Sequence, residues 1–138
     1  MLDLTDSKGA HIDARLRDEP IIWLSSVRPD GRPHLVPVWF WWDGATILIF
    51  SKPAAQKVRN LRHSPQVMLA LDSADAGEDI VLLEGRADLL GDDAPQSTLP
   101  EYAEKYAALM ARINITAASM AVEYTQAIRV AIERLVRF

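Results

Sequence analysis

Three β-prone runs follow one another near the start of the chain, and only short turns separate them. The runs span residues 21–27, 34–42 and 45–50. In the first turn Pro29 presets φ, and Gly31 can take the positive φ of a turn that ends in a bulge. The second turn is Asp43-Gly44, a strong two-residue hairpin signal. We therefore expect an antiparallel meander to begin the fold.

Further strands and helices follow in the pattern of a small barrel. Strands are predicted over residues 66–71, 79–90 and 126–138, and helices over residues 5–18, 54–63, from Pro100 onward, and up to about Tyr124. Gly85 interrupts an alternating run and predicts a bulge or bend. The last run fits both a strand and a helix. We assign it as a strand, because a meander of five strands needs closure to remove its edges. The expected class is mainly β: a largely antiparallel barrel of about six strands with flanking helices.

Composition limits the classes of protein that fit this chain. Its 138 residues suit a single domain over residues 1–138, and its formal net charge of −4 does not indicate nucleic-acid binding. The chain has no cysteine, which excludes disulfides and thiolate chemistry. No signal peptide and no apolar run of about 18 residues is visible. We expect a cytoplasmic protein without a nucleic-acid or membrane partner.

A candidate anion site follows the third β-prone run. Ser51 and Lys52 end that run, Pro53 favours the first turn of a helix, and Lys57 falls near the helix start. Free backbone N–H groups, a hydroxyl and two lysines at such a point suit a phosphate. Arg59 and Arg62 add positive charge against the overall negative sign of the chain. The same residues also fit a solvated helix start, and spacing alone leaves both interpretations open.

Four consecutive aromatic residues occupy positions 39–42. Strand alternation places Trp39 and Trp41 on one face, and Phe40 and Trp42 on the other. A barrel core can bury one face, so we expect the other to be exposed unless a partner subunit or a flat ligand covers it. Just before this run, Pro37 cannot donate to a β-ladder and so marks an edge or a bulge.

Catalytic and metal-binding motifs are absent from the sequence. It contains no Gly-x-Ser-x-Gly, no Gly-x-Gly-x-x-Gly and no P-loop. The three histidines, His11, His34 and His63, lack metal-ligand spacing and are interpreted as structural or surface residues. We therefore expect no metal site, and no residue is assigned as a catalytic acid or base.

Three segments in order resemble the pyridoxamine 5′-phosphate oxidase-like split-barrel superfamily, and in particular its short flavin/deazaflavin oxidoreductases. Residues 25–39 resemble the opening hairpin, residues 51–67 the phosphate-binding strand–helix–strand, and residues 80–87 the next strand. The resemblance implies a split β-barrel homodimer that binds two cofactors at the subunit interface. The aromatic-and-arginine signature that reads pyridoxal phosphate in the true oxidases is not evident near the C-terminal end.

The resemblance also assigns site residues and a function. Lys57 matches the phosphate-contacting lysine, Ser51 and Lys52 match residues beside the same phosphate, and Gln56 stands where the true oxidases carry arginine. The strand that lines the flavin ring corresponds to Val36, Pro37, Val38 and Trp39. The implied activity is hydride transfer between coenzyme F420, a deazaflavin, and a small organic substrate. The alternatives are an FMN-dependent oxidoreductase and a non-enzymatic flavin- or haem-binding, stress-related protein.

Overall fold

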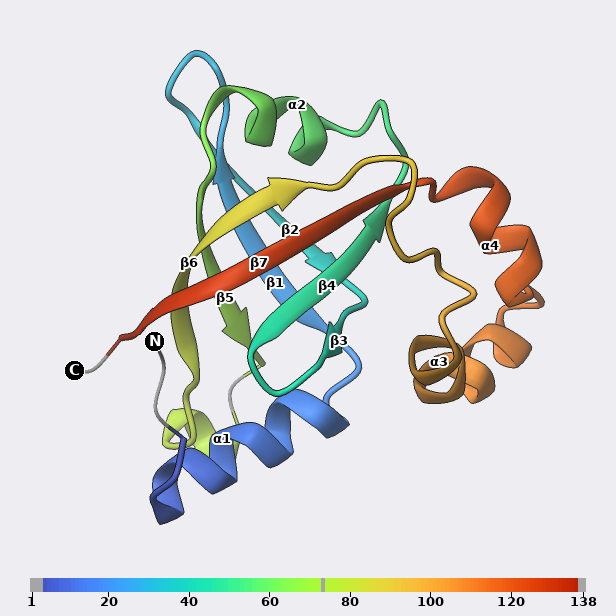
Figure 1. Cartoon of the computed structure of the whole chain (residues 1–138). Coiled ribbons are helices and arrows are strands. Elements are labelled where there is room, and N and C mark those ends of the chain that lie inside the picture. Colours follow the sequence, from blue (N-terminus) through green and yellow to red (C-terminus); the bar gives the residue numbers. More distant parts are fainter. Residues whose placement is uncertain (1–3, 73, 137–138) are drawn as a thin grey trace.

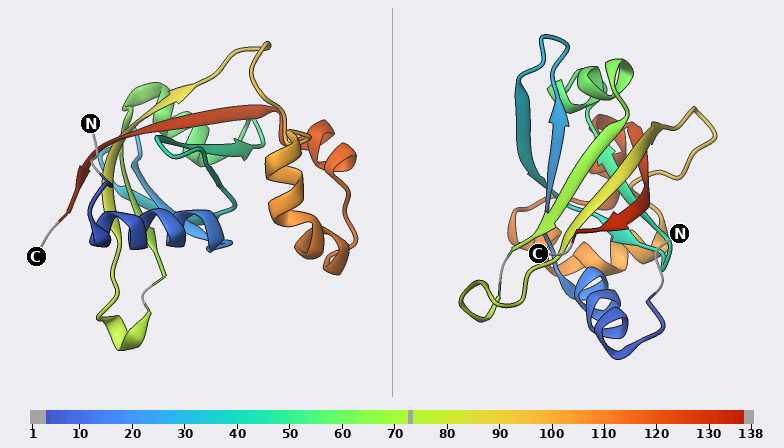
Figure 2. Two further views of the ribbon diagram at one scale, coloured as in Figure 1. Left: turned by 60° about the horizontal axis from the view of Figure 1, so that its bottom comes forward. Right: turned by 90° about the vertical axis from the view of Figure 1, so that its left-hand side faces the viewer.

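Seven strands form one antiparallel sheet in the computed structural model, which describes residues 4–72 and 74–136. The strands are β1 (Ile22–Val27), β2 (Pro33–Val38), β3 (Trp41–Trp42), β4 (Thr46–Ser51), β5 (Gln66–Leu71), β6 (Leu82–Leu89) and β7 (Gln126–Leu135). Their order across the sheet is β2-β1-β5-β6-β7-β4-β3. The sheet curls into a half-barrel (Figures 1 and 2). The predicted class, a largely antiparallel split barrel, is confirmed.

The expected number of about six strands is wrong by one. Residues 34–42, predicted as a single strand, divide into β2 and β3 with a break at Trp39 and Phe40. The short β3 then pairs with β4, whereas β2 pairs with β1. One β-prone run therefore supplies both edges of the sheet, which is why strand propensity alone does not reveal the break.

The helices cover the two ends and one side of the half-barrel. They are α1 (Ser7–Asp18), α2 (Gln56–His63), α3 (Pro100–Arg112) and α4 (Ala117–Glu123), with a short 3-10 turn, η1 (Asp75–Gly77). In Figure 1, α1 lies at the bottom, α2 at the top, and α3 and α4 at the right. None of the helices within residues 4–72 and 74–136 is long and apolar enough to cross a membrane.

Strand β7 holds the two halves of the sheet together. It pairs with β4 along residues 126–131 and with β6 along residues 128–135. The ladder between β6 and β7 shifts register between Glu84 and Gly85, so the predicted irregularity at Gly85 is confirmed. A Cβ on Gly85 would lie 2.7 Å from the Ala131 carbonyl oxygen, so only glycine fits there without movement of the backbone. The choice of a strand for the last run is also confirmed over Gln126–Leu135, and residues 137 and 138 of that prediction lie outside the described residues.

Two hydrophobic clusters make up the core. The larger one lies inside the half-barrel, where Ile12 and Leu16 of α1 join the inward residues of the strands. The smaller one lies on the opposite face of β4, where Leu48 and Phe50 pack against Tyr102 and other residues of α3 and α4. Because β4 is covered on both faces, five of its six residues are buried, as the continuous apolar run predicts.

The expectation of an exposed aromatic face is wrong. Phe40 and Trp42 are buried in the main core, with 0% and 2% of their surface exposed. Trp39 and Trp41 are half-buried, and they pack against the second cluster, which α3 and α4 contribute. The chain itself thus covers both faces of residues 39–42, and these residues no longer argue for a subunit interface.

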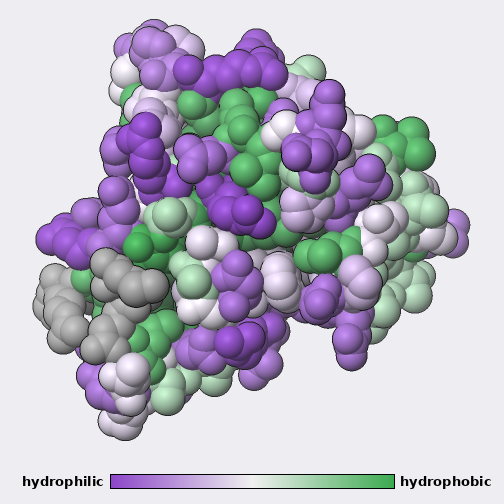
Figure 3. All heavy atoms as spheres, in the orientation of Figure 1, coloured by the Kyte–Doolittle hydropathy of each residue, from purple (hydrophilic) through white to green (hydrophobic). Residues whose placement is uncertain are grey.

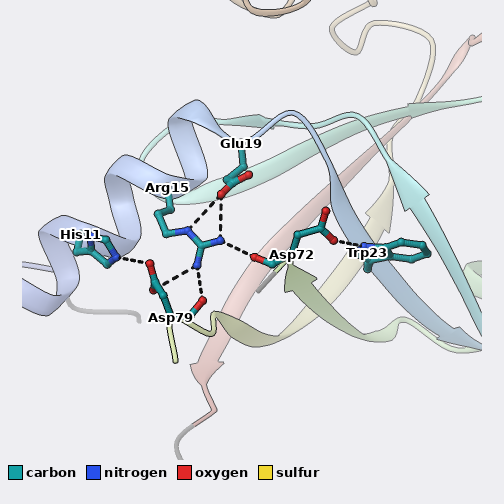
Figure 4. Close-up of polar contacts among 6 residues, drawn as sticks. All are labelled: His11, Arg15, Glu19, Trp23, Asp72 and Asp79. Atoms are coloured by element: carbon teal, nitrogen blue, oxygen red, sulfur yellow. Dashed lines mark hydrogen bonds and ion pairs between the residues drawn. The ribbon is translucent and has the colours of Figure 1, made fainter. Parts of the chain in front are cut away.

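A buried arginine attaches α1 to the loop that follows β5 (Figure 4). Arg15 donates to the backbone carbonyls of Asp72 (2.6 Å) and Asp79 (2.8 Å). The same guanidinium pairs with Glu19 at 3.0 Å and with the Asp79 carboxylate at 3.3 Å. His11 and Trp23 extend this cluster by hydrogen bonds to Asp79 and Asp72. Helix α1 is thereby fixed across one end of the half-barrel.

Candidate functional site

A cavity of about 290 Å³ lies between the end of β2, the start of α2 and the α3–α4 pair. Its lining is aromatic or aliphatic except for one lysine: Pro37, Val38, Trp39, Phe50, Lys57, Tyr102, Ile113, Ile115, Met120 and Tyr124. Apolar walls with a single fixed charge are typical of small-molecule sites, in which the charge sets the orientation of the ligand.

Lys57 supplies that charge. It lies in the first turn of α2, as predicted, and is partly buried. Burial lowers the pKa of its ammonium group, because desolvation disfavours the charged form. Within the described part of the chain, Lys57 makes no side-chain hydrogen bond or ion pair. Partial burial of a cation that has no partner costs desolvation free energy, and an ion pair with an anionic ligand would offset this cost.

The start of α2 differs in detail from the prediction. The helix begins at Gln56 rather than near residue 54, and Ala55 is its N-cap. Since alanine has no side chain that can accept a hydrogen bond, the first turn has no side-chain cap. The opposing helix dipole adds to the cost of a cation at this position.

The structure brings half of the eight predicted site residues to the cavity. Pro37, Val38, Trp39 and Lys57 line it. Val36 instead packs against the main core, although it belongs to the same strand. The remaining three, Ser51, Lys52 and Gln56, lie near the cavity without lining it.

Those three residues have protein partners of their own. Ser51 is fully buried, and its hydroxyl donates to the Lys52 carbonyl at 2.9 Å. The Lys52 ammonium lies 3.9 Å from Glu123 and 5.6 Å from the ring centroid of Tyr124, a residue of the cavity wall. Gln56 donates to Asn60 at 2.8 Å, and the fully buried Asn60 donates to Ser26 of β1 at 3.0 Å. This chain of hydrogen bonds fixes α2 against the sheet, and so fixes the position of Lys57.

Pro37 lies on an edge strand, as predicted, because β2 pairs only with β1. The Arg28 N–H donates to the Arg32 carbonyl at 2.8 Å, and hydrogen-bonded pairs alternate from there along the ladder. The backbone groups of Leu35 and Pro37 therefore point away from β1, toward the free edge. Pro37 contributes a carbonyl there and no N–H, so this edge is richer in acceptors than in donors.

A tyrosine of α3 fixes the Trp39 wall. The two rings stack, with 4.4 Å between the centroids of Trp39 and Tyr106 and 3° between their planes. The Tyr106 hydroxyl accepts from the Phe40 N–H at 2.8 Å and has two acceptors within reach, the carbonyls of Pro20 (2.8 Å) and Phe40 (2.9 Å). It therefore satisfies backbone groups at the break between β2 and β3. Burial raises the pKa of Tyr106 well above its ordinary value, so the residue stays neutral.

Sequence reasoning missed the walls that α3, α4 and the residues flanking them contribute. These residues are Tyr102 of α3, Ile113 and Ile115 between the helices, Met120 of α4 and Tyr124 after it, together with Phe50 of β4. The helical spacing of Tyr102 and Tyr106 predicts that α3 has an apolar face, but not which surface it covers. Asn114 takes a positive φ of 61° between the two helices, and this turn brings Ile113 and Ile115 to the cavity.

Positive charge gathers outside the cavity at the end of the molecule that carries α2. Figure 3 shows a mostly hydrophilic surface there, over α2 and the turn between β1 and β2. Arg59 and Arg62 are exposed on α2, as expected of helix arginines. In residues 4–72 and 74–136 no group of three or more His, Asp or Glu side chains is placed to hold a metal ion.

The sequence profile described as pyridoxamine 5′-phosphate oxidase matches residues 9–136, nearly the whole chain. The chain belongs to this family. The resemblance inferred from residues 25–39, 51–67 and 80–87 is therefore confirmed. No curated protein matches the chain in sequence.

The solved structures that resemble this chain include proteins named for different ligands. An F420 reductase is 24% identical, with a TM-score of 0.55 and coverage of 88% of this chain and 91% of the reductase. A FAD-binding protein from Mesorhizobium loti is 19% identical (TM-score 0.62; 91% and 88% covered). The haem storage protein HutZ of Vibrio cholerae is 15% identical (TM-score 0.65; 91% and 89% covered). At these identities the likeness shows a shared fold, and function has to be argued from the site.

Proposed function

We propose that this protein is an oxidoreductase that uses a flavin-type cofactor, coenzyme F420 in first place and FMN as the alternative, to transfer a hydride to or from a small organic substrate. The observation that carries the proposal is Lys57, a partly buried cation that has no partner among the described residues and lines an otherwise apolar cavity. A tricyclic ring with a phosphoryl group has the matching chemistry.

The residues of the chain divide the work of binding. Lys57 donates to the phosphoryl oxygen, and the bound anion offsets the cost of burying the ammonium group. The free edge of β2, at Leu35 and Pro37, orients the ring through backbone groups. Trp39, held by Tyr106, closes one wall and excludes water. The cofactor, when bound, supplies the hydride chemistry, and the protein supplies orientation and electrostatics.

The charges outside the cavity favour coenzyme F420 over FMN. Both cofactors present a ring and a phosphoryl group, so Lys57 alone does not distinguish them. The deazaflavin also carries an acidic tail, which Lys52, Arg59 and Arg62 would attract, since all three are exposed on the same end of the molecule. Gln56, at the place of an arginine in the true oxidases, is engaged with Asn60 and does not add to this charge.

We further propose that the protein is a homodimer with the cofactor at the interface, and the outer face of the sheet supports this. Leu35 of β2 and Met68 of β5 lie on either side of Ser25, and Val27 lies on the same face. The exposed fractions of these three apolar side chains are 61%, 39% and 39% for Leu35, Met68 and Val27. A second copy of this face would cover them. The face adjoins Pro37, so the partner subunit would complete the cavity.

A non-enzymatic flavin- or haem-binding protein is the second candidate. The observation that favours it is that the lining of the cavity contains no carboxylic acid and no histidine, and its ionisable groups are Lys57 and two tyrosines. Burial raises the pKa of Tyr102 far above neutrality, so it does not readily give up a proton. A bound ring that no substrate reduces or reoxidises would favour this candidate.

Titration of purified protein with FMN and with coenzyme F420, followed by fluorescence, tests the leading proposal. We expect Lys57→Ala to weaken both by roughly ten- to a hundredfold, because it removes a charge-assisted contact worth about 1.5–3 kcal/mol. Arg62→Ala is the matched control on the same helix. It should leave FMN binding unchanged and weaken only the deazaflavin, through its tail. Equal binding by wild type and Lys57→Ala would refute the site.

A further inference from the structure

Tyr102 of α3 is enclosed by the protein, yet its hydroxyl group has no protein partner. The residue is 1% exposed and belongs to the second hydrophobic cluster, and its hydroxyl makes no hydrogen bond with any described residue. The described side-chain atoms that are both unpaired and fully shielded from solvent belong to other residues, so the Tyr102 oxygen keeps some accessible surface. Since Tyr102 lines the cavity, that surface opens onto the cavity. An unpaired hydroxyl on a buried tyrosine is uncommon, because such groups normally find a hydrogen-bond partner.

Neighbouring rings fix the position of this hydroxyl. The Tyr102 ring lies 4.9 Å from the Tyr106 ring, and it meets Phe50 edge-on, with 4.8 Å between the centroids and 86° between the planes. Tyr106, one helical turn further on, has three backbone partners for its own hydroxyl, so the same helix carries one satisfied tyrosine and one unsatisfied tyrosine. A donor that is already held in place loses little conformational freedom when a ligand binds to it.

Among the described residues, the wall around Tyr102 carries no charged side chain. The other residues that α3, α4 and the segments beside them contribute to the lining are Ile113, Ile115, Met120 and Tyr124. Burial raises the pKa of Tyr102 far above its ordinary value, so the phenol stays neutral. With Lys57 engaged by the phosphoryl group of the proposed cofactor, an anionic substrate would lose its hydration at this wall without gaining a cation. An uncharged ligand that has an acceptor oxygen would pair the hydroxyl at a much smaller cost.

We propose that Tyr102 is the hydrogen-bond donor that recognises an uncharged carbonyl compound in this cavity. This rests on the proposed function, in that the cofactor uses Lys57 and the edge of β2 and leaves the α3–α4 side to the substrate. A phenol is a better donor than acceptor, because its lone pairs are delocalised into the ring, so a carbonyl oxygen is the matching group. The apolar walls suit an aryl or alkyl body. Carbonyl compounds also accept hydrides, which agrees with the proposed function.

Two ligands of nearly equal shape isolate the hydrogen bond. Acetophenone carries a carbonyl oxygen where α-methylstyrene carries a methylene group, and neither is charged. Ligand-observed nuclear magnetic resonance titration gives the ratio of the two affinities. Tyr102→Phe should shift this ratio toward the hydrocarbon by roughly two- to tenfold, the range expected for one neutral hydrogen bond. With acetophenone labelled with carbon-13 at the carbonyl, the resonance of the bound ligand should lie further downfield in wild type than in Tyr102→Phe.

Tyr124→Phe removes the other phenol of the lining and is the matched control. Tyr124 is partly exposed, so water can satisfy its hydroxyl in the free protein, and the ratio should persist in this variant. Urea unfolding checks that Tyr102→Phe folds, and its stability should stay close to that of wild type because no hydrogen bond within the described protein is lost. An unchanged ratio in Tyr102→Phe, or a shift that occurs only in Tyr124→Phe, would overturn the proposal.

Titration of acetophenone in the presence of saturating FMN separates this inference from the proposed function. Binding of acetophenone beside FMN, with the ratio still dependent on Tyr102, would support both. If FMN displaces acetophenone, the hydroxyl faces the cofactor, so the assignment to a substrate is overturned while the proposed function stands. If neither FMN nor F420 binds the wild type but Tyr102→Phe still shifts the ratio, the proposed function fails and the carbonyl site stands.

Discussion

Replacement of Arg15 by methionine should destabilise the protein by about 3–5 kcal/mol, the cost of breaking a buried ion pair by removal of one partner. Methionine keeps much of the aliphatic stem but none of the donors. The carbonyls of Asp72 and Asp79 then lose hydrogen bonds of 2.6 and 2.8 Å. Each bond from a charged donor is worth about 1.5–3 kcal/mol, so the two carbonyls alone account for most of the effect. The side chains of Glu19 and Asp79 remain 30% and 27% exposed, so water can solvate both carboxylates and limits the further loss.

The matched control is Arg17→Met, on the same helix. Arg17 also pairs with an acid one turn away, Asp13 at 2.9 Å, but 52% of its side chain is exposed. An exposed pair of this kind is worth at most about 1 kcal/mol.

Urea unfolding followed by circular dichroism gives the free energies of unfolding of both variants. For a domain of this size, the Arg15 variant should also melt roughly 10–20 °C lower. A difference of less than about 0.5 kcal/mol between the two variants would refute the role assigned to burial. Because α1 and α2 lie at opposite ends of the molecule (Figure 1), cofactor affinity should not change in the folded Arg15 variant.

Two further predictions concern α3 and the outer sheet face. Tyr106→Phe should cost about 1–3 kcal/mol in urea unfolding, because the buried Phe40 N–H loses its acceptor. Tyr102→Phe, at a hydroxyl that makes no hydrogen bond with the described residues, should cost far less, and equal losses would contradict the argument. Leu35→Asp should convert the proposed dimer to a monomer in sedimentation at micromolar concentration, whereas Val122→Asp, at an exposed position of α4, should not. A monomeric wild type would end the dimer proposal.

Turn chemistry and strand periodicity made much of the sheet predictable. Gly31 and Gly44 take positive φ values of 90° and 96° in the two predicted turns, a conformation that other residues adopt at a cost. The bulge at Gly85 and the strand at the end of the chain also follow from local pattern combined with the need to close the sheet. In each case the deciding interaction is either local or imposed by backbone pairing.

The aromatic run shows where such reasoning stops. Alternation correctly separates Trp39 and Trp41 from Phe40 and Trp42, but it does not show that the strand breaks between β2 and β3. That break is stabilised by Tyr106, a residue distant in sequence, through a hydroxyl and a stacked ring. The α3 and α4 walls of the cavity escape prediction for the same reason. The position of Lys57 in the first turn of its helix could be predicted from the sequence, because it depends mainly on local structure.

The double pairing of β7 has a consequence for the rate of folding. Residues 46–51 pair locally only with the two-residue β3, and they reach the rest of the sheet through residues 126–131, so most of the chain must be searched before β4 can join the main sheet. Topologies dominated by such distant pairings fold in milliseconds to seconds rather than microseconds. Until β7 docks, β4 and β6 each present an unpaired apolar edge, and in this interval the chain is most exposed to association with other chains. Mutations that slow the docking of β7 should therefore lower the yield of folded protein more than its final stability.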